Sequence, residues 1–408
     1  MGSDSSGLER GGADRIAQFA RQEIGPYLAD HPEDRYPLPL VQRLAALGVF
    51  GATVPTQCGG DGWSRQDVAR IGYELGRGWQ PLAGLVGTHL KLCRQVLEHG
   101  TVQQRAQLLG PMARGETVFA RAYHEQGVAH PAALTTRVTR RGLVAVLNGR
   151  KSWVTNARHA DRVLALARSG DATVGVLVDP ARPGVTVGPE LPRPGLLGVS
   201  LAEITFSDYE FEPDEATLGG WGHDLTDSLL SHDLTSYTAR AVGSADAVLD
   251  HAVRFVREGW AHRSADARGA MRLRLGEMAT KVAVMRTIWH ALLDSRRPGD
   301  EAASTAPHPP MTSAAAKVFC TSTLQDVVRE AALLCGGAGY AAPEQALGRH
   351  YRDALALPII GSPNDVLLSG LGERELSRPA GESPESGHRA ETETSPVAGC
   401  RAGAETVR

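Results

Sequence analysis

Asp233 occupies an apolar helical stripe, where a carboxylate can do acid–base chemistry. It lies four residues from Leu229 and four from Tyr237, so the three side chains share one face of a helix. Partial desolvation on such a face raises the pKa of a carboxylate toward the range that a general base needs. The alternative is an aspartate near a helix start, where the helix dipole favours negative charge. The position therefore predicts either a proton acceptor or an ordinary acidic residue at the start of a helix.

General motifs of other catalytic classes are missing from the chain. It has no phosphate-binding GxxxxGK[ST], no dinucleotide-binding GxGxxG, no HExxH and no GxSxG. The histidines and the five cysteines are scattered, without the spacing of a metal site. These absences disfavour hydrolases, nucleotide-transfer enzymes and metalloenzymes.

Composition and charge narrow the possible partners. The 408 residues carry 43 basic and 46 acidic side chains, so the chain lacks the basic excess that binding to a phosphate backbone requires. No run of about 18 apolar residues suits a transmembrane helix. The first residues also lack the apolar segment of an export signal. We expect a cytoplasmic protein that binds neither nucleic acid nor membrane.

The elements that would position Asp233 fall into three parts. Helical spacing of apolar residues predicts an N-terminal helical domain over residues 14–118, after a flexible N-terminus at 1–13. Short apolar runs bounded by turn residues, such as Val163–Ala167, predict a β domain over 119–219. Long helical periodicity then predicts a C-terminal bundle over 220–375. A tail rich in Ser, Glu and Pro, residues 376–408, is expected to be disordered.

Five phrases, taken in order, resemble those of the flavin-dependent acyl-CoA dehydrogenases. The most specific is LNGRKSWVTNA at residues 147–157, which is similar to the family's NGxKxWVTNA. The others are similar to family phrases at residues 47–60, 99–116, 317–340 and 351–354. Together they span residues 14–372, so the resemblance covers nearly the whole folded part.

The resemblance implies an α+β fold of the acyl-CoA dehydrogenase type, with an N-terminal α-helical domain, a middle β-barrel-like domain and a C-terminal helical bundle. It places FAD between the last two. Hydride would pass from Cβ of an acyl thioester to the flavin while a carboxylate removes the α-proton. Trp153 would pack on the flavin ring, and the Thr155 hydroxyl would donate near N5, where a dipole stabilises the reduced ring. The alternative for both residues is an ordinary strand role, with Trp153 filling a core.

Further cofactor contacts follow from the same resemblance. Glu125 lies on the loop expected at the pyrimidine side of the flavin. Gly336 and Gly337 belong to the segment that is similar to GGxGY. Ser362 and Asn364 belong to the loop equivalent to the family's IYEGT. The resemblance assigns all five to FAD binding.

Three segments depart from the family pattern. HEQGVAHP at residues 124–131 replaces TEPxxGSD and lacks its serine. The family's RxQFG is replaced at residues 257–263, where Arg257 either pairs with the FAD pyrophosphate or belongs to a solvated basic loop. Ile360 stands where IYEGT has its catalytic glutamate. One branch, that of isovaleryl-CoA dehydrogenase, carries its base on the first long helix of the C-terminal bundle, and Asp233 falls at that position.

The sequence thus predicts an FAD-dependent dehydrogenase of acyl-CoA or acyl-carrier-protein thioesters, in specialised, polyketide or lipid metabolism. The resemblance implies a homodimer or homotetramer, with an electron-transfer flavoprotein or oxygen as electron acceptor. Two alternatives stay open. One is a non-catalytic partner subunit of a hetero-oligomeric dehydrogenase, and the other is a non-redox enzyme that reuses the cleft without flavin.

Overall fold

The N-terminal part of the chain is helical, as its apolar spacing predicted. The computed structural model describes residues 11–31, 34–128, 131–226, 234–294, 312–341 and 346–377. A short π-helical segment, Ala20–Ile24, joins the first two helices. The helices are α1 (Gly12–Phe19), α2 (Gly25–Asp30), α3 (Leu38–Ala46), α4 (Arg65–Gly78), α5 (Gln80–His99) and α6 (Val102–Ala113).

Capping residues fix where these helices begin. The Ser64 Oγ accepts a hydrogen bond from the Asp67 N–H ahead of α4, and Thr101 forms a capping box with Gln104 at the start of α6. The Gln104 amide also donates to the carbonyl oxygen of Thr217 at 2.7 Å. The cap of α6 therefore fastens the helical part to the segment that follows the sheet.

The middle part is a seven-stranded mixed sheet in the order β1-β4-β2-β3-β7-β6, with β5 paired to β4. β1 runs parallel to β4, whereas β3 pairs antiparallel with both β2 and β7. The short apolar runs of the sequence lie in β3, β4 and β5, which confirms the β prediction. The strands are β1 (Phe119–Ala122), β2 (Arg137–Arg141), β3 (Val144–Thr155), β4 (Arg162–Ser169), β5 (Ala172–Val178), β6 (Val185–Val187) and β7 (Leu201–Phe211).

Long helices return after the sheet. A short helix, α7 (Pro213–Ala216), follows β7. A core of α9, α10 and α11 residues, including Val248, Val282 and Leu324, makes these helices a bundle. Of the remaining helices, α14 buries none of its side chains. The helices are α9 (Thr235–Gly259), α10 (Ala265–Asp294), α11 (Ser313–Cys335), α12 (Gly337–Ala341), α13 (Ala346–Ala354) and α14 (Asn364–Ser377).

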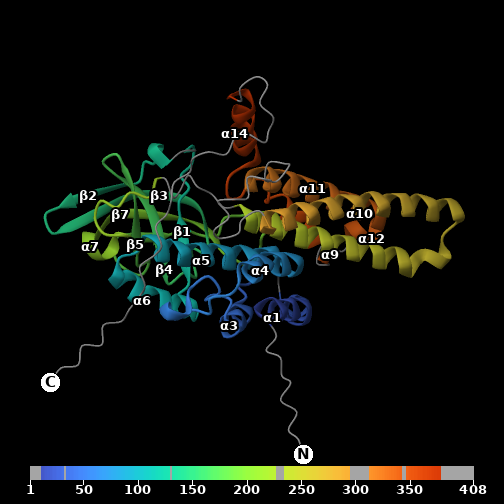
Figure 1. Ribbon diagram of the computed structural model, residues 1–408, viewed down its shortest axis with the longest axis horizontal. Helices are drawn as coiled ribbons and strands as arrows, with labels where there is room; N and C mark the ends of the chain where they lie inside the picture. Colours follow the sequence, from blue (N-terminus) through green and yellow to red (C-terminus); the bar gives the residue numbers. More distant parts are fainter. Residues whose placement is uncertain are drawn as a thin grey trace, which may run out of the picture.

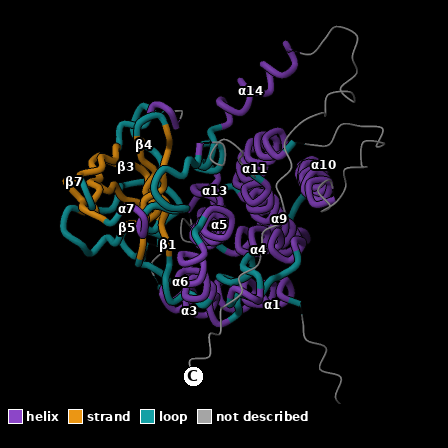
Figure 2. Tube along the Cα trace, turned by 60° about the vertical axis from the view of Figure 1, so that its left-hand side comes forward, coloured by secondary structure: helices purple, strands orange, loops and turns teal. Residues whose placement is uncertain are grey.

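Helix α5 lies where the three parts meet. Figure 1 shows the sheet at one end of the molecule and the bundle of α9, α10 and α11 at the other, with α5 between them. Figure 2, turned by 60°, again places α5 between the sheet and the bundle. On the sheet side, Leu92 and Val96 of α5 share a buried apolar cluster with Phe119 and Leu164. A residue on α5 can therefore contact all three parts.

Helices α4 and α9 approach so closely that glycine is required between them. A Cβ at Gly243 would lie 2.0 Å from the Tyr73 carbonyl oxygen, and a Cβ at Gly76 would lie 2.7 Å from that of Arg240. Such distances leave no room for a methyl group. The two glycines thus set how the N-terminal helices sit on the bundle, and with it the position of the neighbouring α5.

The described helices include none that is both long enough and apolar enough to cross a membrane. The tail predicted over residues 376–408 begins inside α14, which runs to Ser377, and its remainder from residue 378 lies outside the described residues.

Candidate active site

Trp153 projects from strand β3 instead of filling a core. The pairing of β3 with β7 shifts register between Lys151 and Val154, and Trp153 sits in that bulge with φ +58°. A positive φ is unfavourable for an aromatic residue, and such strained positions gather at functional sites. The residue is 58% exposed, so the alternative that Trp153 fills a core within this chain is wrong.

Thr155 and Asn156 follow in the same strand end. Thr155 still pairs with Leu201 of β7, which fixes the direction of its side chain. Asn156 also has a positive φ, +64°, and its amide is buried with neither oxygen nor nitrogen hydrogen-bonded within the chain. Buried polar groups without partners are rare in native proteins. The end of β3 therefore offers an exposed aromatic face, a hydroxyl and an unsatisfied amide.

Beneath Trp153, a buried ion pair holds β3 to the loop after β1. The Lys151 Nζ lies 2.7 Å from Glu125 Oε1, and both side chains are almost fully buried. Thr135 and Thr136 also donate backbone N–H groups to this carboxylate. Burial would raise the pKa of Glu125, but these hydrogen bonds outweigh it and lower the pKa to about 2. Burial lowers the pKa of Lys151 to about 8 despite the carboxylate beside it, so both groups stay charged at neutral pH.

The Glu125 carboxylate thus points into the β domain, where both of its oxygens have partners. The sequence predicted this residue as a cofactor contact. In the structure its side chain acts on the loop, by holding the backbone of residues 124–128 against β3. Any contact from Glu125 to FAD is therefore left to its backbone.

The loop between α13 and α14 carries Ser362 and leads into Asn364, the first residue of α14, and Lys317 holds both. The Lys317 Nζ donates to the Pro358 and Ser362 carbonyl oxygens at 3.0 and 2.8 Å, and to the Asn364 Oδ1 at 2.8 Å. The side chain is fully buried, which lowers its pKa to about 8. The side-chain oxygen of Asn364 is thus occupied by Lys317. Between Pro358 and Asn364 the loop contains no carboxylate, and Ile360 packs on the bundle core.

Three predicted cofactor residues lie elsewhere along the bundle. Arg257 is exposed near the end of α9, twenty residues beyond Tyr237, a separation of about 30 Å at 1.5 Å per residue. Gly336 ends α11 with φ +59°, and neither it nor Gly337 has an atom within 4 Å of an added Cβ. Figure 1 shows α12, which follows them, on the bundle away from the sheet. Within one chain the predicted contacts therefore form two separate groups. Asp233 lies outside the described residues.

A cluster that sequence reasoning missed surrounds Tyr237, in the first turn of α9. The Lys91 Nζ of α5 lies 4.3 Å from the centre of the Tyr237 ring, and the Arg240 Cζ lies 5.8 Å from it. Burial raises the pKa of Tyr237, but the charges of Lys91, Arg240 and Arg121 outweigh it and hold that pKa below its ordinary value. A Cβ at Gly361 would lie 2.7 Å from the same ring. Tyr237 therefore joins α5, β1 and α9 to the loop that Lys317 anchors.

One signal in the sequence could have pointed to some of these groups. Lysines number only four among the 43 basic residues: Lys91, Lys151, Lys281 and Lys317. Two of them are fully buried, and Lys91 faces Tyr237. Three of the four lysines thus lie in or beside the candidate site, where the ammonium donates to carbonyl oxygens or faces an aromatic ring, whereas Lys281 lies at the surface.

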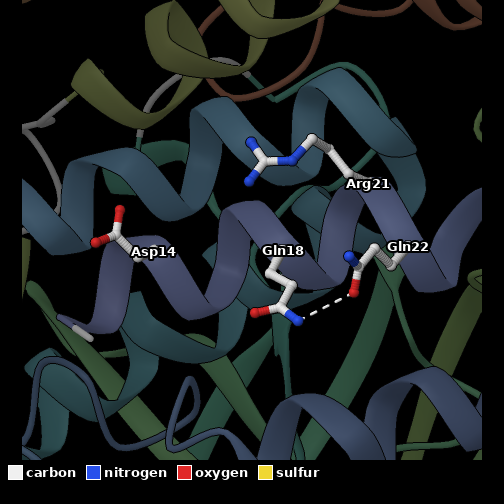
Figure 3. Close-up of a pocket in the computed structure, with 4 residues that line it drawn as sticks. All are labelled: Asp14, Gln18, Arg21 and Gln22. Atoms are coloured by element: carbon white, nitrogen blue, oxygen red, sulfur yellow. Dashed lines mark hydrogen bonds between the residues drawn. The ribbon is translucent and has the colours of Figure 1, made fainter. Parts of the chain in front are cut away.

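A separate hollow on the outer face of the first helices offers no comparable chemistry. Asp14, Gln18, Arg21 and Gln22 line it (Figure 3), and all four are exposed. The Gln18 Nε2 donates to the Gln22 Oε1 at 3.0 Å. It belongs to the solvated face of the helices rather than to the junction around α5.

Known proteins identify the class to which this fold and site belong. Family models for the N-terminal, middle and C-terminal domains of acyl-CoA dehydrogenases match residues 9–116, 124–209 and 220–376. The chain belongs to the acyl-CoA dehydrogenase family. The predicted fold is therefore confirmed.

Individual relatives match over nearly their full length. A benzylmalonyl-CoA dehydrogenase from Aromatoleum aromaticum is 30% identical over 92% of this chain and 100% of its own. Subunit CarC of the caffeyl-CoA reductase–Etf complex from Acetobacterium woodii is 24% identical over 86% of this chain and 95% of its own. The solved structure of butyryl-CoA dehydrogenase from Megasphaera elsdenii superposes with a TM-score of 0.79 at 22% identity. The superposition covers 90% of this chain and 97% of the butyryl-CoA dehydrogenase chain.

Members of this family are FAD-dependent, and the residues at the end of β3 fit that cofactor. The exposed Trp153 ring supplies a flat apolar surface, and Thr155 supplies a hydroxyl beside it. The buried Asn156 amide next to them has no hydrogen-bond partner among the described residues, which is compatible with a polar ligand at this strand end. The chain is thus an FAD-dependent oxidoreductase of the acyl-CoA dehydrogenase class.

Proposed function

We propose that this chain catalyses α,β-dehydrogenation of an acyl thioester carried on CoA or on an acyl carrier protein. FAD, when bound, supplies the acceptor for the two electrons. The observation that carries the proposal is the exposed indole of Trp153, which a bulge and a left-handed backbone hold beside Thr155.

The chain's own residues keep this aromatic face in position. β3 is paired on both sides, with β2 and β7, and the Lys151–Glu125 pair fixes it from beneath. A strained backbone persists only where its surroundings determine it fully. Trp153 would orient the ring system, and the Thr155 hydroxyl would donate a hydrogen bond where negative charge develops.

Asp233 is the proposed base for the α-proton. The anchored loop offers Ile360 where the family phrase has a glutamate, and an isoleucine cannot accept a proton. Asp233 precedes α9 in the sequence and lies four residues before Tyr237. A carboxylate near a weakly acidic C–H is effective as a base when burial raises its pKa toward the working pH.

A second copy of the chain would complete the cofactor site. Arg257, Gly336 and Gly337 lie on the bundle, with Arg257 about 30 Å along α9 from Tyr237 at 1.5 Å per residue. They suit the pyrophosphate and adenosine of an FAD whose ring lies in another chain. We therefore propose a homodimer or homotetramer.

Electrons would leave through an electron-transfer flavoprotein or through oxygen. The CarC relative is part of a complex with Etf, which supports the first acceptor. We also propose that the thioester is carried on CoA or on a carrier protein. The reaction would belong to specialised, polyketide or lipid metabolism.

The test is flavin content and bleaching of the purified protein. Trp153→Ala should lower flavin occupancy, measured from visible absorbance, and Trp153→Phe should restore much of it because a ring returns. Asp233→Asn should keep the flavin spectrum and lose about 10²- to 10⁴-fold in the rate of bleaching by an acyl thioester. Glu277→Gln, which removes an exposed charge from α10, is the matched control.

No flavin after reconstitution with excess FAD would support the non-redox alternative. Flavin that no acyl thioester bleaches would support the partner-subunit alternative. An Asp233→Asn protein that bleaches at the original rate would remove Asp233 as the base.

A further inference from the structure

The basic cluster around Tyr237 is drawn from all three parts of the chain. Lys91 comes from α5, Arg121 from β1 and Arg240 from α9. Each of the three acts electrostatically on the Tyr237 hydroxyl. Side chains this far apart in sequence meet only in the assembled molecule, so the cluster belongs to the domain junction and not to any one domain.

Within the part of the chain that the structure describes, which leaves out Asp233, these three cations form no close ion pair. Among the described residues, no carboxylate lies within 4 Å of the charged nitrogens of Lys91, Arg121 or Arg240, although the chain forms many such pairs elsewhere. The Arg121 Nε is buried without any hydrogen-bond acceptor. Burying unpaired positive charge is unfavourable unless an anion joins it.

The remaining contacts of the cluster orient it without neutralising it. Arg240 donates to the side-chain and backbone oxygens of Gln80, which are uncharged. Asp353 acts on Arg240 over a longer distance, while its Oδ1 accepts the Leu196 N–H at 2.6 Å. Gln80 therefore fixes the guanidinium in place without supplying a negative charge.

In the proposed function, on which this inference rests, the cluster would lie next to the reacting carbons. Tyr237 touches the loop at Gly361, beside the position where the family has its base. β1, which carries Arg121, and β3, which carries Trp153, both contact α5. An anion held here would lie within a few bonds of the thioester. The phosphates of CoA or of a carrier protein are separated from the thioester by the whole pantetheine arm.

We propose that Lys91, Arg121 and Arg240 bind a carboxylate on the acyl group of the substrate. The chain then acts on acyl thioesters of dicarboxylic acids and discriminates against acyl groups that end in a methyl group. A guanidinium can hold a carboxylate through two parallel hydrogen bonds, the ammonium adds a compact charge, and the Tyr237 hydroxyl supplies a neutral donor.

Pairs of CoA thioesters that differ only at the acyl end test this selectivity on the FAD-loaded protein. The pairs are malonyl- and propanoyl-CoA, succinyl- and butanoyl-CoA, and glutaryl- and pentanoyl-CoA. Calorimetry measures binding for all three pairs, and flavin bleaching is recorded separately for the succinyl/butanoyl and glutaryl/pentanoyl pairs, because malonyl-CoA has no hydrogen on its β carbon. At one chain length or more, the dicarboxylic member should bind at least about 10-fold more tightly, because a charge-assisted contact is lost in its partner.

Lys91→Met and Arg121→Met should each remove about 10- to 100-fold of the affinity for the dicarboxylic member and leave that of the methyl-ended member unchanged. Arg121→Lys should recover part of the loss. Arg94→Met is the matched control, since Arg94 lies on α5 one turn from Lys91 but pairs with Glu98 at the surface. It should leave the preference intact.

Equal binding of both members at every length would overturn the proposal, and this comparison needs only the unaltered protein. Equal losses for both members in the variants would overturn it too, because a structural role affects all ligands alike. A variant-sensitive preference without any flavin bleaching would support the carboxylate site while rejecting the proposed dehydrogenation. Bleaching by methyl-ended thioesters alone would support the proposed dehydrogenation while rejecting the carboxylate site.

Discussion

Replacing Lys151 by methionine should lower the free energy of unfolding by about 3 kcal/mol. Removing one partner of a buried ion pair costs about 3–5 kcal/mol, because the other charge stays buried. We expect the lower end of this range for Lys151→Met, for two reasons. Glu125 keeps its hydrogen bonds from Thr135 and Thr136, and the buried ammonium, whose own pKa burial lowers, disappears with the change. The Tyr123 carbonyl oxygen also loses its donor, at 3.1 Å.

Thermal unfolding at neutral pH measures the effect. About 3 kcal/mol corresponds to a fall in Tm of roughly 6–12 °C for a domain of 150–250 residues. Lys281→Met is the control, since Lys281 is 38% exposed and its Nζ lies 3.7 Å from the Asp326 carboxylate. An exposed pair of this kind contributes less than about 1 kcal/mol.

The dependence on pH provides a second measurement. In the unaltered protein the pKa of Glu125 is about 2, so the carboxylate stays charged at pH 5. Without the ammonium that pKa rises, and protonation relieves the unpaired charge as the pH falls. The difference in Tm between the variant and the unaltered protein should therefore narrow from pH 7 to pH 5. If Lys151→Met and Lys281→Met melt together, the pair does not hold β3.

Two further predictions concern packing and acid stability. Gly243→Ala should destabilise by about 3 kcal/mol or more, because its Cβ would lie 2.0 Å from a backbone oxygen; Gly276→Ala in α10, with nothing within 4 Å, should stabilise by about 0.5–1 kcal/mol. Urea titration of both variants compares them, and equal midpoints would contradict the close approach of α4 and α9. Burial lowers the pKa of His350 to about 3, against 6.5 when unfolded, so stability should fall as the pH drops below 6.5. The loss should be about 2 kcal/mol at pH 5, and an equally steep pH dependence in His350→Gln would exclude this histidine as its source.

The sequence was sufficient to predict most of the fold. Runs such as Val163–Ala167 are short, apolar and bounded by turn residues, and strand formation depends on that local pattern. The long helical periodicity of the C-terminal part likewise predicted the bundle to which α9, α10 and α11 belong, since an amphipathic helix is a local property as well.

The site was harder to predict because its decisive features depend on distant contacts. Glu125 is a loop acid in sequence, and only Lys151, 26 residues later, turns it inward. The bulge at Trp153 depends on the register with β7, which local pattern does not specify. Lys91, Arg121 and Arg240 lie 30 and 119 residues apart along the chain, so no spacing rule groups them.

Because Lys317 holds the loop mainly through backbone oxygens, the path of the loop depends little on which side chains the loop carries. Two of the three acceptors of Lys317 are backbone carbonyl oxygens, which every residue possesses. The side chain at position 360 does not contribute to that anchor, so it can change by substitution while the path of the backbone is retained. This chain has Ile360 in that loop and keeps the hydrogen bonds from Lys317 to the loop backbone. A proton acceptor is in this sense a replaceable part: an evolving enzyme can give it up at the loop and recruit one from a neighbouring helix without rebuilding the scaffold around it.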